Sequence, residues 1–549
     1  MKTIDPKDTN PNFPRADISE GGREHGKFWV SIFAIPALIF SCWLMFHTFS
    51  YDAIHHNLLI SSKAWSDFGA HIPLIRSFSY GPNLSRLFHN QTVESPLFPG
   101  KPIRYYFGFY LLVALLEKLG MRIDWALNIP SALGFFFLLV GIYVLAKKLF
   151  QKTSVALLSV LFFLCNGSLS FLRFFQSHTL FDIVTNSMFP SFGPWDGGDI
   201  TAFWNLNIYT NQRHLALSYA LVIAAILLAL SKKKSVPLLV GTAAALLFVS
   251  YPSFAIMGVI LLWIFLLEKS SRVPLVVAGI ITIPALLFLR HVAHLGSNIV
   301  WLPGYLSNGN FIRFWFDNLG LHIFLIPLGL LLSPKRVRTL LIGPLLILFL
   351  LPNLFRFSPD MINNHKFFNF FLIIGSMVSA YAITRISSLR TIGKTLAALI
   401  IFFCILSGII DFFPVMNDYY GTVPDIQASR DEQFFLAHTK PTDVIADSTW
   451  FYHPASIAGR SLFSGYTYFT WSYGYDQVPR ENTLKALYAA PDAQTACTLI
   501  RGNNIAYVEL NGHPESYLSP NWQLWSTLTP VYQNPETHLR VFSENSICD

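Results

Sequence analysis

Long apolar runs separated by short polar stretches set the pattern of this chain after its first 27 residues, which are polar. One helix crosses a bilayer with ~20 apolar residues, so the runs predict about eleven crossings. We expect them at residues 28–46, 126–146, 154–174, 213–231, 236–251, 253–267, 273–290, 319–333, 339–354, 367–384 and 395–413. Because no small-residue cleavage site follows the first run, we expect an uncleaved helix there. The pattern predicts a polytopic α-helical membrane protein.

Two apolar stretches do not fit a full crossing. The run from Tyr105 to Leu116 has 12 residues, which is too short to span and fits a helix that lies at the membrane interface. Residues 236–267 fit two short spans that meet at Ser250–Ser253. A single crossing there would reverse the direction of every later helix.

Short basic clusters between the apolar runs predict the orientation. They lie within residues 147–152, 232–234, 269–272, 335–338 and 385–394. The positive-inside rule assigns all five to the cytoplasm. The N-terminal segment 1–27 is then cytoplasmic, residues 28–413 form the membrane domain, and residues 414–549 are extracytoplasmic, in a cell or inner membrane. Four longer connections, 48–125, 175–212, 291–318 and 354–366, share the outer face.

Composition agrees with a membrane protein and divides the charge between two parts. Apolar residues make up 53% and charged residues 13% of the chain, against about 25% charged in soluble domains. Residues 415–549 hold 7 Lys and Arg against 14 Asp and Glu, a net charge of −7. Because the whole chain carries +8, the remaining residues carry +15. The basic loops account for that excess, so nucleic acid is not an expected partner.

The C-terminal segment 414–549 has the pattern of a small α/β domain. We expect strands at 442–446 and 505–510 and helices at 481–490 and 492–501. Cys497 and Cys548 can pair if this domain faces an oxidising compartment. The aromatic stretch 466–476 either stacks on a sugar or lipid, or packs against the membrane domain.

Asp67 and His71 in the first outer loop are the candidate catalytic pair. The apolar positions Phe68, Ile72 and Ile75 predict an amphipathic helix, on which residues four apart share a face. A partly desolvated carboxylate at the lipid boundary is suited to take a proton from a hydroxyl nucleophile. The alternative is a polar pair that keeps one face of the helix in water.

Asp196 and Asp199 are the candidate metal ligands. Carboxylates three residues apart suit a hard divalent cation, but Asp-Gly is also a common turn pair.

Several cations and histidines fall at outer helix ends and could bind a lipid phosphate. These candidate substrate-binding residues are Lys101, Arg104, Arg213, His214, His365 and Lys366. Arg in particular binds phosphate through paired donors. Each of them could instead be an interface anchor that sets the position of a helix. No GxSxG, HExxH, Walker or GxGxxG motif supports nucleotide hydrolysis or hydride transfer.

The order of these features resembles the GT-C superfamily of membrane glycosyltransferases, in particular its protein mannosyltransferase-like and aminoarabinose transferase-like branch. The best local match is residues 101–165, with KPIRYY at 101–106 and PSALGFFFLLVGIYVLAKKLFQK at 130–152. Ile103 replaces the second proline of the family pattern, and Phe68 replaces the acidic residue that usually follows Asp67. The NNHK at 363–366 and the later Ala458-Gly459-Arg460 resemble other polytopic relatives, so Arg460 joins the candidate substrate-binding residues.

The resemblance implies a polyprenyl-phosphate-linked sugar as donor and a hydroxyl on lipid, glycan or protein as acceptor. Asp67 would be the general base of an inverting attack, and Arg213, Lys101 or Lys366 would stabilise the leaving phosphate. His71 and Asp199 are secondary candidates, and a divalent metal is compatible. The alternatives are a non-catalytic lipid or glycan transporter and a glycan-binding membrane protein.

Overall fold

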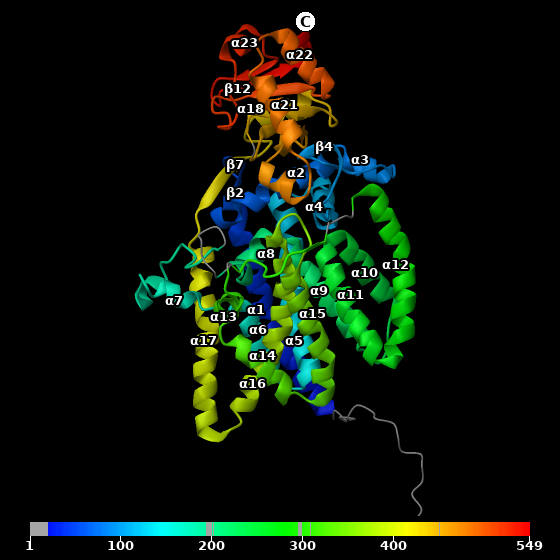
Figure 1. Cartoon of the computed structure of the whole chain (residues 1–549), viewed down its shortest axis with the longest axis vertical. Helices are drawn as coiled ribbons and strands as arrows, with labels where there is room; N and C mark the ends of the chain where they lie inside the picture. The colour runs from blue at the N-terminus through cyan, green and yellow to red at the C-terminus, as the bar shows by residue number, and fades with distance from the viewer. Residues whose placement is uncertain (1–19, 194–199, 201, 295–298, 308, 450) are drawn as a thin grey trace, which may run out of the picture.

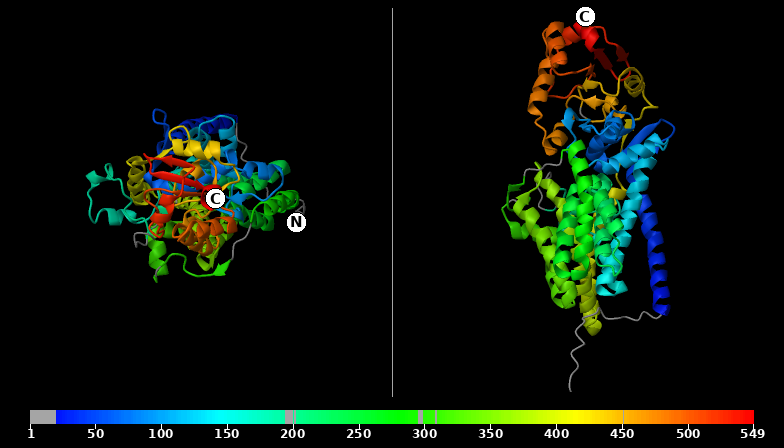
Figure 2. Two further views of the ribbon diagram at one scale, coloured as in Figure 1. Left: turned by 90° about the horizontal axis from the view of Figure 1, so that it is seen from above. Right: turned by 90° about the vertical axis from the view of Figure 1, so that its right-hand side faces the viewer.

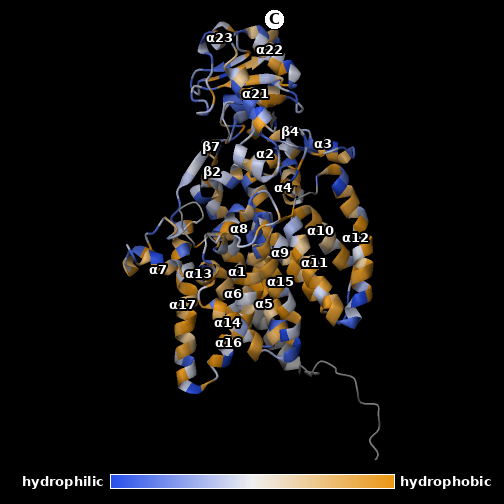
Figure 3. Cartoon of the chain, in the orientation of Figure 1, coloured by the Kyte–Doolittle hydropathy of each residue, from blue (hydrophilic) through white to orange (hydrophobic). Residues whose placement is uncertain are grey.

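The computed structural model describes residues 20–193, 200, 202–294, 299–307, 309–449 and 451–549. A long helical bundle forms most of the molecule, and the C-terminal α/β layer lies on one end of it (Figure 1). Elements of residues 49–107 lie between the two, as the perpendicular views also show (Figure 2). Apolar residues cover the sides of the bundle, whereas the C-terminal layer and the opposite helix ends are more polar (Figure 3).

The bundle is built around α16 (His365–Ile386), which is almost fully enclosed by its neighbours. Around it lie α1 (Glu20–Thr48), α5 (Ile123–Phe150), α6 (Thr153–Leu164), α9 (His214–Ala229), α10 (Val236–Val249), α11 (Tyr251–Leu267), α12 (Arg272–Val292), α14 (His322–Leu332), α15 (Lys335–Leu354) and α17 (Arg390–Met416). By contrast, α12 and α17 stand at the margins with long apolar faces exposed. Such faces are expected of helices that contact lipid.

Each predicted span contains a helix, but helices of full spanning length are fewer. Within the described residues, five helices are long and apolar enough to cross a membrane, or six if a bent pair counts as one span. The other apolar helices have 10–17 residues. Several candidate membrane spans are therefore present, and the number eleven stays a prediction. The expected break at Ser250 is where α10 ends and α11 begins, with the Ser250 hydroxyl accepting from Ser253 N.

The first loop is folded throughout its length. It contains β1 (Phe49–Asp52), β2 (Asn57–Ser61), α2 (Trp65–Ser79), α3 (Asn83–Phe88), β3 (Glu94–Ser95), β4 (Phe98–Pro102) and α4 (Gly108–Lys118). Strand β2 pairs antiparallel with both β1 and β7 (Tyr420–Pro424). The first loop is therefore hydrogen-bonded to the chain that follows the last predicted span. Helix α2 differs from the expected amphipathic helix, because Phe68–Ser79 is buried on every face.

A five-stranded sheet in the order β11-β12-β10-β8-β9 forms the C-terminal layer. Its strands are β8 (Val444–Ala446), β9 (Ser461–Leu462), β10 (Tyr507–Leu510), β11 (Tyr532–Asn534) and β12 (Leu539–Ser543), with β8 parallel to β9 and β10. Around it pack α18 (Arg430–His438), α21 (Val478–Tyr488), α22 (Ala493–Gly502), α23 (Trp522–Thr527) and α24 (Glu544–Cys548).

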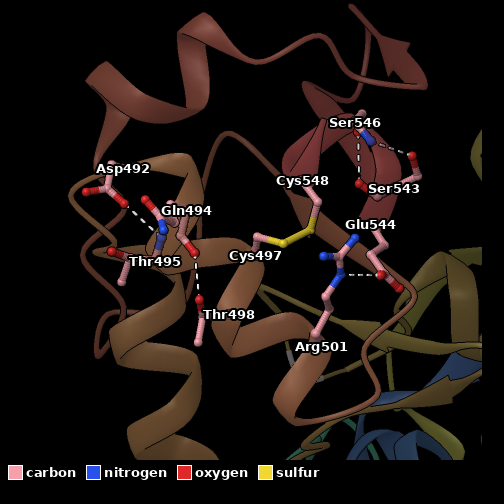
Figure 4. The surroundings of a disulfide bond; sticks show 10 residues. All are labelled: Asp492, Gln494, Thr495, Cys497, Thr498, Arg501, Ser543, Glu544, Ser546 and Cys548. Carbon is pink, nitrogen blue, oxygen red and sulfur yellow. Dashed lines mark hydrogen bonds and ion pairs between the residues drawn. A yellow bond between two sulfur atoms is a disulfide. The ribbon is translucent and has the colours of Figure 1, made fainter.

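A disulfide between Cys497 and Cys548 joins α22 to α24, a pairing that the sequence alone left open (Figure 4). The same helices are held by an ion pair in which Arg501 Nε donates to Glu544 Oε1 at 2.8 Å. Three of the basic clusters lie together at the far end of the bundle. There Lys234 Nζ donates to Ser270 Oγ at 3.1 Å, and Arg336 pairs with Glu268.

Candidate active site

A cavity of about 370 Å³ lies where the first loop, the bundle and the C-terminal layer meet. The first loop contributes Lys63, Ser66, Asp67 and Tyr105, and the chain before α9 contributes Phe192, Phe203, Asn207, Ile208, Asn211 and Gln212. The start of α16 and the loop before it add Asp360, Ile362, Asn363 and Lys366. The C-terminal layer closes the cavity with Tyr466, Tyr468, Phe469, Ser472 and Tyr473.

Asp67 lies in the first turn of α2, half-buried, with its carboxylate in the cavity. Burial raises the pKa of this carboxyl to about 6, against the opposing attraction of Lys366 and a hydrogen bond from Asn211. A base whose pKa lies close to the working pH is suited to proton abstraction. Of the predicted catalytic residues, Asp67 therefore occupies the position from which it can react with a bound ligand.

Lys366 is the cation that faces Asp67. It sits in the first turn of α16, is 3% exposed, and donates from Nζ to Asn363 Oδ1 at 2.8 Å. It also interacts electrostatically with Asp360, a second carboxylate in the cavity. Asp360 accepts from Ile362 N at 3.0 Å and from the Tyr468 hydroxyl at 2.6 Å. The cavity thus places one buried ammonium between two carboxylates.

His71 does not face the cavity, although it lies one turn from Asp67. Its ring packs against Tyr110 at 4.7 Å and Tyr105 at 6.5 Å between centroids. Burial lowers the pKa of His71 to about 3, helped by the charge of Arg213, so the imidazole is neutral. The helical spacing of the two residues is correct, but Asp67 turns toward the cavity and His71 toward an aromatic cluster. The geometry gives His71 no direct catalytic role.

Arg213 is a buried tie between helices and does not line the cavity. Its guanidinium donates to Thr210 O, Met45 O, Thr48 Oγ1 and Asn128 Oδ1 at 2.6–3.3 Å. A guanidinium has five N–H donors, and these contacts to α1 and α5 use them within the protein. The predicted contact with a lipid phosphate is therefore not supported. His214 is likewise fully buried and pairs with the Tyr110 hydroxyl at 3.1 Å.

Lys101 and Arg104 also lie outside the cavity wall. Lys101 is exposed on β4. Arg104 donates to Gly474 O and lies over the Tyr475 ring at 4.9 Å. Arg104 therefore fixes the C-terminal layer on the first loop, and its cation is not directed at a ligand.

His365 contacts residues of the cavity lining, whereas Arg460 lies away from it. His365 stacks on Phe203 at 4.8 Å and contacts Gln212 Nε2 at 3.4 Å, and both of those residues line the cavity. Arg460 is 2% exposed and donates to carbonyls of Leu436, Thr439, Ala458 and Tyr80. The contact with Tyr80 ties the C-terminal layer to the end of α2.

The predicted metal ligands Asp196 and Asp199 lie outside the described residues. Within the residues that the structure does describe, no group of three or more His, Cys, Asp or Glu side chains is arranged to hold a metal ion.

Sequence reasoning missed Asp360, Asn207 and Asn211. Asp360 lies three residues before Asn363 of the NNHK motif, and this closeness was the only sign of it in the sequence. The aromatic stretch 466–476 packs in part on the first loop through Tyr475, and Tyr466 and Tyr468 line the cavity, so its stacking on a sugar or lipid stays a prediction.

The fold and the site define a class: a helical membrane protein with an acidic and lysine-bearing cavity enclosed beneath an α/β layer. The chain is similar to the archaeal oligosaccharyltransferase AglB from Archaeoglobus fulgidus, solved with an inhibitory peptide and a dolichol-phosphate. The TM-score is 0.41 at 13% identity, over 88% of this chain and 70% of that one. It is also similar to ArnT from Cupriavidus metallidurans in the apo state, with a TM-score of 0.49 at 12% identity, over 96% of this chain and 99% of that one.

Both identities lie below 25% and both TM-scores below 0.5, so the resemblance to the GT-C superfamily stays a prediction. No family model and no curated protein matches the chain. At these identities and TM-scores the likeness does not assign an activity, and the function is argued from the site.

Proposed function

We propose that this protein is a membrane glycosyltransferase that moves a sugar from a polyprenyl-phosphate donor to an acceptor hydroxyl, with Asp67 as general base. The observation that supports the proposal best is the pairing, in one cavity, of a carboxylate whose pKa is raised to about 6 with a buried lysine. The first group is suited to accept a proton and the second to stabilise a phosphate. Both activities are needed in one step of glycosyl transfer.

In that step the acceptor oxygen forms a bond to the anomeric carbon as the bond from this carbon to the phosphate oxygen breaks. Asp67 accepts the hydroxyl proton, and polyprenyl phosphate leaves with the electron pair of the broken bond. Attack from the face opposite the leaving group inverts the anomeric centre. Lys366 supplies the positive charge beside the departing phosphate, where low polarity strengthens the interaction.

Asp360 has a supporting role in this proposal. Its electrostatic interaction with Lys366 and its hydrogen bond from Tyr468 hold together the α16 side and the C-terminal side of the cavity. A fixed arrangement of charges before the reaction is what electrostatic catalysis requires.

The test is sugar transfer by membranes that contain the wild type or Asp67→Asn. We expect Asp67→Asn to abolish transfer and to leave the lipid-linked donor accumulated in extracts, which also identifies the sugar. Asp52→Asn is the matched control, because Asp52 is a carboxylate of β1 that pairs with His55 and does not line the cavity. Full transfer by Asp67→Asn at wild-type protein levels would remove Asp67 from the mechanism.

The same experiment separates the alternative functions. A glycan-binding protein would retain the donor without product in the wild type as well as in the variant. A transporter would change the side on which the donor is found but leave its total amount unchanged.

A further inference from the structure

Four aromatic residues that line the cavity come from one short C-terminal segment, in addition to Tyr105, Phe192 and Phe203 from earlier parts of the chain. Helix α20 (Thr467–Ser472) and its flanking residues contribute Tyr466, Tyr468, Phe469 and Tyr473. We call these four residues the aromatic wall. Phe469 is buried beneath, whereas the three tyrosines are half-buried. The tyrosine rings therefore keep surface that a ligand can cover.

Hydrogen-bonding groups line the same cavity. Asn207 and Asn211 of α8 (Asn207–Asn211), together with Asn363, present amides, and Asp67 and Asp360 present carboxylates. Amide groups can donate and accept, and carboxylates accept. The cavity thus combines aromatic rings with polar groups, and its volume is near the small end of the ~300–1,000 Å³ typical of ligand sites.

A sugar ring likewise combines an apolar face with hydrogen-bonding groups. Its C–H face is apolar and can cover an aromatic ring, while its hydroxyls need donors and acceptors around the edge. We infer that the aromatic wall binds the sugar ring of the lipid-linked donor, with the ring stacked on Tyr468 and Tyr466 and its hydroxyls directed at the amides and at Asp360. This inference rests on the proposed function and names the part of the chain that recognises the sugar.

Tyr468 is the wall residue best suited to a test. Tyr466 is also packed against Phe451 at 4.4 Å and Tyr473 against Tyr105 at 4.9 Å, so changing either would disturb the junction with the first loop. The ring centroids nearest to Tyr468 are 5.8–6.2 Å away, and its hydroxyl donates to Asp360. Trp471 on the same helix is 43% exposed and does not line the cavity, which makes it a matched control.

The experiment measures binding without turnover, in full-length Asp67→Asn protein. The probes are farnesyl phosphate esters of glucose, mannose and galactose, and farnesyl phosphate without sugar. We expect Tyr468→Ala to weaken binding of the preferred sugar ester by about tenfold and to leave the sugar-free lipid unchanged. Tyr468→Phe keeps the ring but loses the hydrogen bond to Asp360, so we expect a smaller loss. Trp471→Ala should bind like the parent.

Each outcome decides one claim. An equal loss for the ester and the sugar-free lipid would overturn the inference, because the wall would then act on the fold or on the lipid. An unchanged affinity for the ester in Tyr468→Ala would overturn it too, as would the absence of any gain in affinity from an attached sugar. Selective loss in Tyr468→Ala, together with no transfer by the wild type, would support the wall and refute the proposed function.

Discussion

The protonation of Asp67 is decided by opposing effects of its neighbours. Burial against the cavity walls favours the neutral acid, whereas Lys366 and the hydrogen bond from Asn211 favour the carboxylate. Burial is the largest of the three, so the pKa rises to about 6. A lone carboxylate in an outer loop could be found in the sequence, but Lys366 and Asn211 could not be assigned to it, because they come from distant parts of the chain.

A pH–rate profile tests this balance. The base works as a carboxylate, so we expect kcat/KM to be full above the pKa and to fall tenfold per pH unit below about pH 6. Lys366→Gln removes the cation that favours the carboxylate, which should move the acid limb to higher pH as well as lower the rate. A profile that stays flat down to pH 4.5, near the ordinary range of an aspartate, would contradict the argument.

A substitution of Arg213 tests whether this cation binds a ligand or holds neighbouring helices together. We expect Arg213→Met to lower the stability of the protein by about 2–4 kcal/mol, because carbonyls of Met45 and Thr210 lose their charged donor. Thermal unfolding in detergent measures this. Lys101→Met is the control, since Lys101 is exposed and should leave the melting temperature unchanged. If Arg213→Met had a normal melting temperature but a reduced affinity for the sugar donor, Arg213 would instead be a substrate-binding residue.

At the scale of elements, apolar runs predict where helices lie but not how they bend or what covers them. The predicted span 319–333 contains α14, and the preceding α13 (Phe311–Leu319) forms a bent pair with it at 78°. Gly320 makes the bend with φ +50°, and a Cβ there would meet Gly167 O at 2.1 Å. Similarly, α2 was expected to be an amphipathic helix at the membrane interface, but it is buried and residues 451–460 pack against it. Contacts of such long sequence separation leave no periodic signal.

The contact between α2 and the C-terminal layer predicts the effect of a single methyl group. Gly69 lies two residues after Asp67 on α2, and a Cβ there would lie 2.2 Å from Phe451 Cδ1. We expect Gly69→Ala to displace Phe451 or α2 and to lower kcat/KM by about 10- to 100-fold, as small displacements of reacting groups do. Gly241→Ala on α10 is the control, because nothing in the described part of the chain lies within 4 Å of the added carbon. Equal activity of the two variants would mean that α2 and the layer move independently.

Considered as a whole, the molecule separates its charges along its length. The basic loops gather at the end of the bundle away from the C-terminal layer, which has the acidic excess and the Cys497–Cys548 disulfide (Figures 1 and 3). Positive loops favour the cytoplasm, and disulfides persist in oxidising compartments. We therefore propose that the cavity opens on the extracytoplasmic side, where a lipid-linked donor is needed in place of a nucleotide sugar.

Cysteine labelling in intact cells tests this orientation. Lys101 is exposed beside the C-terminal layer, and Lys233 is exposed in the basic loop between α9 and α10. In a background where Cys42, Cys165 and Cys404 are replaced by serine and the disulfide is kept, we expect Lys101→Cys to react with a membrane-impermeant maleimide. Lys233→Cys should react only after the bilayer is opened, because the reagent cannot reach the cytoplasm. The reverse result would place the cavity on the cytosolic side, where donors with a nucleotide leaving group are available. A lipid-linked donor would then no longer be required.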